Sequence, residues 1–261
     1  MATQIMRTRN PALNTDEFLG TAPASIGTAA ETMTVQGTVN KTAILLLLVV
    51  VSAGWVWKKF TSYPLPAAAP EAAAAVAPWL YGGLFGGLVL ALVTVFKKSW
   101  APVTSPLYAL AEGLFLGGLS SMIEARYPGI VIQAVALTFG TLFALLIAYK
   151  SRLIVVTARF RMGVVAATGG IFLVYLFSLV AGLFGLQVPL IFGSGLVGVA
   201  FSLFVVVIAA LNLVLDFDFI ERGERNGAPK YMEWYGAFGL LVTLVWLYIE
   251  ILRLLTKLRS R

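Results

Sequence analysis

The sequence contains no cysteine and no histidine. Their absence removes the ligands of common zinc sites, cysteine nucleophiles, and Ser-His or Cys-His catalytic pairs. Charged residues are also scarce: they make up 12% of the 261 residues, about half of the usual share in soluble domains. The formal net charge of +7 is carried by short basic clusters between apolar runs. We therefore expect contact with the lipid bilayer and its headgroups, and no binding of nucleic acid.

Apolar residues make up 59% of the chain, and the mean hydropathy is +0.90. This composition predicts an all-α fold, a bundle of seven transmembrane helices. The expected spans are 43–57, 79–96, 104–123, 130–149, 164–184, 192–219 and 231–255. The first run approaches spanning length only from about residue 39, so the predicted membrane domain is 39–258. Residues 1–38 are polar and small, which predicts a flexible tail that is not a cleaved signal peptide.

The boundaries of the first helices follow from local signals. Thr38 or Asn40 is expected to cap the first helix. Prolines interrupt the segment 61–78, which predicts a loop or a short helix outside the membrane. The second run carries Gly82, Gly83, Gly86 and Gly87 in two interleaved GxxxG spacings, which predict close packing on a neighbouring helix.

Basic residues between the runs predict the orientation in the membrane. With the N-terminus in the cytoplasm, twelve Lys and Arg lie inside and seven outside. The strongest basic cluster between two runs lies inside in this arrangement, at 150–161, and the uncharged loop 185–189 lies outside. A basic cluster at the C-terminus opposes the rule.

The sixth run closes with two carboxylates, Asp216 and Asp218. Ionisable groups are costly inside a membrane span and usually face a polar interior. Two residues turn a helix through about 200°, so at most one of the two is expected to face into the bundle. Asp216 lies deeper, roughly 7 Å from the end of the run, and is the one expected to face inward. For Asp218 we expect a solvated position at the helix end.

Other acids lie along the neighbouring runs. Glu112 is roughly 12 Å inside the third run, and is either a neutral acid bonded to another helix or a functional group. Glu233 enters the seventh run from the same side, whereas Glu250 lies far along that run, toward the other face. Arg161 is expected at the rim as a charge partner. The acids expected to form one layer in the cytoplasmic half are Glu112, Asp216, Asp218 and Glu233.

Two acids that lie close together in an interior of low dielectric constant cannot both ionise cheaply, so they share a proton. When both are charged they repel each other, and their oxygens can coordinate a hard cation such as Ca²⁺. We therefore predict ion binding and gating at Asp216 and a partner acid. We expect no tightly bound metal and no other cofactor.

Two strings, LNLVLDFDFIERG at 211–223 and YMEWYGAFGLLVTLVWLYIEILRLL at 231–255, make the chain resemble the Bax inhibitor-1 family of seven-span membrane proteins. The strings GTVNKT at 37–42 and SPLYALAEGLFLGGLSSMIEARYPGIVIQA at 105–134 support the resemblance, which covers about residues 38–258. The likeness is strongest for bacterial members, which implies a bacterial inner (plasma) membrane.

The resemblance implies a bundle with its last helix in the centre and a calcium leak that is sensitive to pH. It also implies a latch between an aspartate at the end of span six and an aspartate in span seven. Asp216 matches the first position. For the second, the family's spacing leads to the region of Leu241, and the local string LYIE leads to Glu250. From their depth, Glu112 or Glu233 can replace the missing partner.

Three functions remain in view. The first is a calcium leak gated by protons, and the second is a non-conducting interaction protein that modulates a membrane protease or a stress response. The third is an intramembrane aspartyl protease. We expect no enzymatic activity, because the GxGD string of presenilin-like proteases is absent and Asp216 and Asp218 face apart.

Overall fold

A computed structural model describes residues 32–65, 67–185 and 193–260, and within these ranges the chain is helical without a β-strand. Among the described residues, seven α-helices are long and apolar enough to cross a membrane, which confirms the predicted fold class. A short 3₁₀ helix, Lys98–Trp100, precedes α4. The helices are α2 (Val35–Thr61), α3 (Ala69–Phe96), α4 (Ala101–Arg126), α5 (Ile130–Lys150), α6 (Ala158–Leu183), α8 (Leu196–Arg225) and α9 (Met232–Arg259).

The first helix begins earlier than its apolar run. Helix α2 begins at Val35, and Thr34 is its N-cap, with the Thr34 side chain accepting a hydrogen bond from the Gly37 amide at 2.9 Å. The capping role expected for Thr38 or Asn40 is therefore wrong, because both lie inside the helix. The tail predicted for residues 1–38 lies largely outside the described residues, and its last residues, from 35 on, are helical.

The segment before the second run is also more helical than predicted. Helix α3 begins at Ala69, with Pro70 in its first turn, and continues through Pro78. The predicted break at Pro78 is therefore wrong. Proline in a helix removes one backbone hydrogen bond, and the alanine-rich segment before Pro78 favours the helix strongly enough to continue through it. Helix α8 likewise continues to Arg225, so part of the connection between the expected spans 192–219 and 231–255 is helical.

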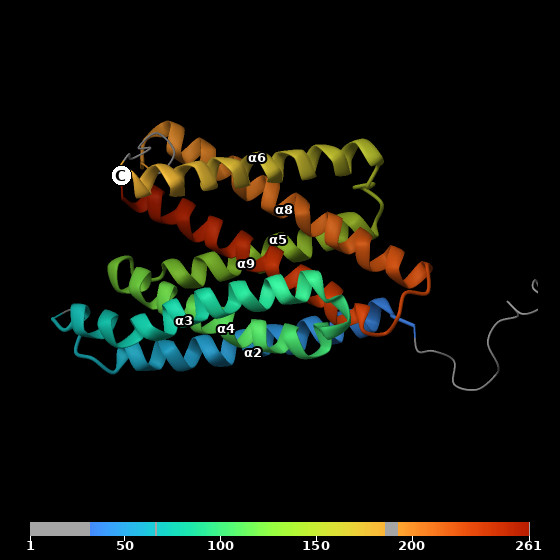
Figure 1. Cartoon of the computed structure of the whole chain (residues 1–261). Helices are drawn as coiled ribbons and strands as arrows, with labels where there is room; N and C mark the ends of the chain where they lie inside the picture. Colours follow the sequence, from blue (N-terminus) through green and yellow to red (C-terminus); the bar gives the residue numbers. More distant parts are fainter. Residues whose placement is uncertain (1–31, 66, 186–192, 261) are drawn as a thin grey trace, which may run out of the picture. The chain divides into compact units, whose positions relative to one another are not determined.

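The last helix is the central one, as expected. Helix α9 packs against α2, α4, α5 and α8, and Figure 1 shows it running between these helices. Inside the bundle 61% of its most apolar segment is buried, against 17% for α3 and for α6. Helix α6 packs along α8, and α3 packs on α4 and α2. Large apolar side chains such as Phe85 and Phe177 are exposed on these outer helices, as expected for surfaces that meet lipid.

The glycines of α3 divide into two groups. A Cβ atom added at Gly83 would lie 2.6 Å from the backbone nitrogen of Phe115 and even closer to the carbonyl oxygen of Ala111, and one at Gly87 would lie 3.0 Å from Glu112 Oε2. At Gly82 and Gly86 an added Cβ would meet no atom within 4 Å. Only one of the two predicted GxxxG pairs, 83 and 87, therefore brings α3 close to α4 among the described residues.

Replacing Gly83 by valine tests this contact. We expect Gly83→Val to lower the free energy of unfolding by roughly 1–3 kcal/mol, because a branched side chain would press against the backbone of α4. The measurement is thermal or denaturant unfolding in detergent micelles. Gly82→Val is the matched control, since it makes the same change in helix propensity where the space is open. Equal stability of the two variants would contradict the packing described here.

Candidate functional site

A tight connection joins the end of α8 to the start of α9 and places the strings 211–223 and 231–255 side by side. Gly227 has a φ of +63°, in the left-handed region that glycine tolerates and that commonly ends a helix. The chain segment before α2 joins this connection, because the Met33 amide donates to the Ala228 carbonyl at 2.7 Å. The starts of α2 and α9 and the end of α8 therefore meet in one region.

Asp216 lies on the side of α8 that faces α9. Its Oδ1 is 4.0 Å from the position that a Cβ on Gly239 would take, and Thr243 is a neighbouring hydroxyl on α9. Asp216 Oδ2 is buried, and among the described residues it has no hydrogen-bond partner. An acceptor oxygen buried without a donor costs free energy, so its setting differs from that of an ordinary structural carboxylate.

Asp218 lies on another side of the same helix and is 8% exposed. Its Oδ2 forms ion pairs with Arg222 on α8 and with Arg161 Nη2 on α6, the latter at 3.1 Å. The solvated position expected for Asp218 is therefore wrong. Helix α8 packs against both α6 and α9, so two of its sides are covered and both aspartates are sheltered. Because the two side chains point in different directions around α8, Asp216 meets α9 and Asp218 meets α6.

Glu233 is completely buried in the first turn of α9 and fastens the start of α2. Its Oε1 accepts hydrogen bonds from the Thr34 amide at 2.9 Å and the Thr34 hydroxyl at 3.0 Å, and it pairs with Lys230 at 3.2 Å. Its Oε2 forms an ion pair with Lys41 on α2. Any side chain at Gly37 would collide with the Glu233 carboxylate. Two cations and two further donors therefore neutralise this acid.

The two remaining acids lie elsewhere in the bundle. Glu112 on α4 is half-buried and faces α3 at Gly87. Glu250 on α9 is 1% exposed; its Oε1 accepts from the Tyr175 hydroxyl at 3.0 Å and pairs with Arg253 Nη1 at 3.1 Å. Arg253 also lies over the Tyr175 ring, 5.1 Å from its centroid. Glu250 is thus a structural link between α6 and α9.

The structure does not assemble the acids into the single layer that we predicted. In the part of the chain that is described, no three Asp or Glu side chains come together as a metal site. Asp218 and Glu233 are both engaged by basic side chains, and neither shares a proton with Asp216 here. The expectation treated depth as sufficient, but the direction of each side chain around its helix decides which neighbour it meets.

Several residues of this region were missed from the sequence. Lys41 was assigned only to membrane topology, although a lysine inside the helical part of GTVNKT signals a buried partner. Tyr149, at the end of α5, donates a hydrogen bond to Glu221 on α8. Lys257 on α9 is buried and donates to the Gly198 carbonyl at 3.0 Å and to Ser202 at 2.8 Å. Only the tertiary arrangement identifies the last two contacts.

The Glu233 cluster yields a stability prediction. We expect Glu233→Gln to lower the free energy of unfolding by roughly 1.5–3 kcal/mol, because the amide loses the charge-assisted bonds to Lys41 and Lys230. Denaturant unfolding in micelles measures the change. Glu71→Gln is the matched control, since Glu71 is also an acid in the first turn of a helix but is exposed. A cluster that contributes nothing would leave the two variants equally stable.

Comparison with known proteins agrees with this architecture. Residues 10–260 match the family model described as Bax inhibitor 1 like. Neither a curated protein nor a solved structure matches the chain. The matched region spans nearly the whole sequence, including every helix of the bundle described above, and the chain therefore belongs to the Bax inhibitor 1 like family.

Proposed function

We propose that this integral membrane protein is a pH-sensitive cation leak, with Ca²⁺ as the transported ion and Asp216 as its proton switch. The observation that carries the proposal is the buried Asp216 Oδ2, which lacks a hydrogen-bond partner among the described residues and lies where α8 meets α9. Ionisable groups in this setting are costly to keep and mark ion or proton pathways in membrane proteins.

The surroundings of Asp216 support a role for this group by itself. On its own helix, Asp218 is paired with arginines and Glu221 with Tyr149 and Arg225. On α9, the neighbours are Gly239 and Thr243, which carry no charge. Among the acids discussed above that are not exposed, Asp216 and Glu112 are the two without an ion pair to a Lys or Arg of the described residues. Of these two, Asp216 faces the central helix α9.

The direction of the pH response follows from the charge. A negative Asp216 at this buried contact requires water or a cation, so ionisation favours separation of α8 from α9 and attracts a cation to the carboxylate oxygens. Protonation removes the charge and lets the two helices close on each other. Flux is therefore expected to rise as the pH rises.

Calcium uptake into proteoliposomes at several pH values tests the proposal. We expect flux through the wild-type protein to increase with pH, and Asp216→Asn to hold a low flux at every pH, because the amide imitates the protonated acid. Glu71→Gln is the control for an exposed acid elsewhere. Equal, pH-independent flux through the wild type and Asp216→Asn would remove the proposal.

A second candidate function is that of a non-conducting interaction protein that modulates a membrane protease or a stress response. It is favoured by the paired state of Asp218, Glu233 and Glu250 and by the apolar outer side of α6, where Phe172 and Phe177 are exposed. In this case Asp216→Asn leaves the capture of a partner unchanged, and no flux is seen with any variant.

The arrangement gives no support to an aspartyl protease. Asp216 faces α9, whereas Asp218 pairs with Arg161 of α6 and Arg222 of its own helix. Two aspartates with different neighbours cannot act together as general acid and base on one peptide bond. A non-enzymatic role in a bacterial inner membrane, with the start of α2 on the cytoplasmic side, is therefore part of the proposal.

A further inference from the structure

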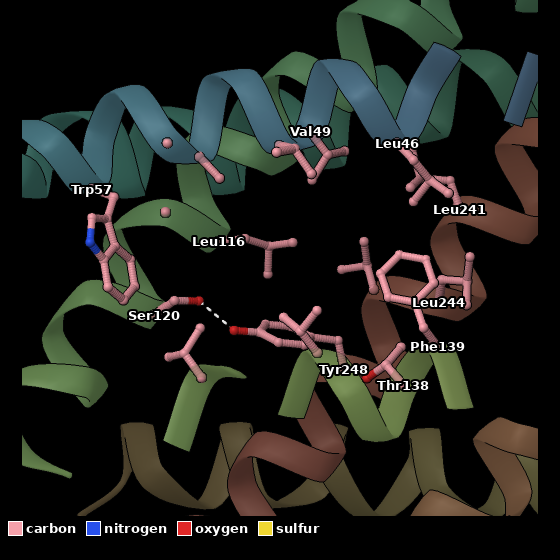
Figure 2. A pocket seen from close by; sticks show the side chains of 17 residues that line it. Leu46, Val49, Trp57, Leu116, Ser120, Thr138, Phe139, Leu241, Leu244 and Tyr248 are labelled. Atoms are coloured by element: carbon pink, nitrogen blue, oxygen red, sulfur yellow. Dashed lines mark hydrogen bonds between the residues drawn. The ribbon is translucent and has the colours of Figure 1, made fainter. Parts of the chain in front are cut away.

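An apolar cavity of about 310 Å³ lies between α2, α4, α5 and α9. Figure 2 shows Trp57 at one end, Leu46 and Leu241 at the other, and Leu116 and Tyr248 between them. The cavity follows α2 from residue 46 to residue 57, a length of about 16 Å along the helix. It is therefore long and narrow enough to hold an extended chain rather than a compact ligand.

The hydroxyl groups that line the cavity are already bonded. Ser120 and Tyr248 share a hydrogen bond of 2.7 Å, which Figure 2 also shows, and the Thr138 hydroxyl donates to the Ala134 carbonyl at 2.7 Å. A cavity water needs two to four polar partners, and these groups leave few sites for it. The lining thus favours an apolar occupant over water.

The cavity opens toward the surroundings of the bundle between α2 and α5. These two helices both pack against α9 but not along each other. Val50, at the opening, is 63% exposed, and a Cβ added at Gly54 would meet no atom within 4 Å. Since α2 and α5 are both spanning helices, the opening faces the interior of the bilayer. The molecules that have access to it are lipids.

We propose that this cavity binds one acyl chain of an anionic phospholipid from the surrounding bilayer. The chain leaves one apolar environment for another, so the hydrophobic effect does not drive its entry. Instead, the side chains that line an empty cavity of this size lack dispersion contacts on one side, and an acyl chain supplies these contacts. Lipid surrounds the opening at the concentration of the bilayer itself, which favours occupancy of the cavity by mass action.

The end of the cavity at Trp57 provides the position for the headgroup. Tryptophan is typical of the membrane interface, and Lys58 follows Trp57 directly. Lys58 is one helical turn beyond Gly54, so it lies on nearly the same face of α2 as the opening. It is exposed, and no carboxylate of the described residues pairs with it. An anionic headgroup at this site has a cation within reach while its chain follows α2 inward.

Photo-labelling tests the site in the reconstituted full-length protein. The probe is phosphatidylglycerol with a diazirine in the middle of one acyl chain, present in vesicles of phosphatidylcholine, and the labelled peptides are identified by mass spectrometry. Within residues 241–248 of α9 we expect the label at Leu241, Leu244 and Tyr248, because these line the cavity yet are buried from lipid outside the bundle. Val242, which is 37% exposed, belongs to the outer residues. Labels on exposed outer residues serve as the internal reference.

Variants that fill the cavity make the test specific. We expect Gly54→Leu to reduce labelling of 241–248 on the order of tenfold, because the added side chain occupies space in the cavity and removes dispersion contacts that an acyl chain would make there. Gly140→Leu is the matched control, because Gly140 is also an exposed helical glycine with open space around it but does not line the cavity. Val50→Trp, which covers the opening from an exposed position, is a second blocking variant in case Gly54→Leu folds poorly.

The headgroup is tested separately with the same probe. We expect Lys58→Gln to reduce labelling by the phosphatidylglycerol probe to the level that the corresponding phosphatidylcholine probe gives. Labelling by the phosphatidylcholine probe should be the same in the wild type and in Lys58→Gln. Labelling of 241–248 that persists in Gly54→Leu and Val50→Trp would overturn the proposal, as would labelling confined to outer residues in the wild type. Crosslinks between two copies of the chain at this opening, in place of lipid adducts, would assign it to a dimer and also overturn it.

Discussion

The structure depends on the enclosure of helix α9. Four helices surround it, so each polar group it carries must be bonded inside the bundle or remain costly. Glu233, near its start, is bonded to Lys41 of α2 and to the Thr34 amide just before α2. Glu250, toward its end, is bonded to Tyr175 of α6. Between the two acids α9 is largely apolar, with Leu241 and Leu247 fully buried. The two acids therefore link the central helix to its neighbours near both of its ends.

The two aspartates of α8 show how the same constraint gives neighbouring residues different roles. Asp218 finds two arginines and becomes part of the framework between α6 and α8. Asp216, two residues earlier, meets a glycine and a threonine on α9 and keeps a buried oxygen without a donor among the described residues. A carboxylate that the framework leaves uncompensated is where a proton has the largest effect on packing, and this contrast is the basis of the proposed switch.

Helix α9 lies between Asp216 of α8 and the apolar cavity. Gly239 and Thr243 face α8, whereas Leu241, Leu244 and Tyr248 line the cavity. At about 100° per residue these two sets lie on roughly opposite sides of the helix. The cavity and Asp216 therefore lie on different sides of α9, and α9 contacts both.

The fold class, the number of spans and, through the family resemblance, the central position of the last helix could be predicted from the sequence. These features depend on the length and composition of apolar runs and on local strings, which are visible without the fold. Three contacts follow only from the packing of the helices: Asp218 is buried with Arg161, Glu233 bonds to Lys41 and Thr34, and Asp216 Oδ2 has no hydrogen-bond partner among the described residues. The physical reason is that depth along a helix follows from counting residues, whereas the partner of a side chain depends on which helix packs against that side, and this is set by contacts between segments far apart in the chain.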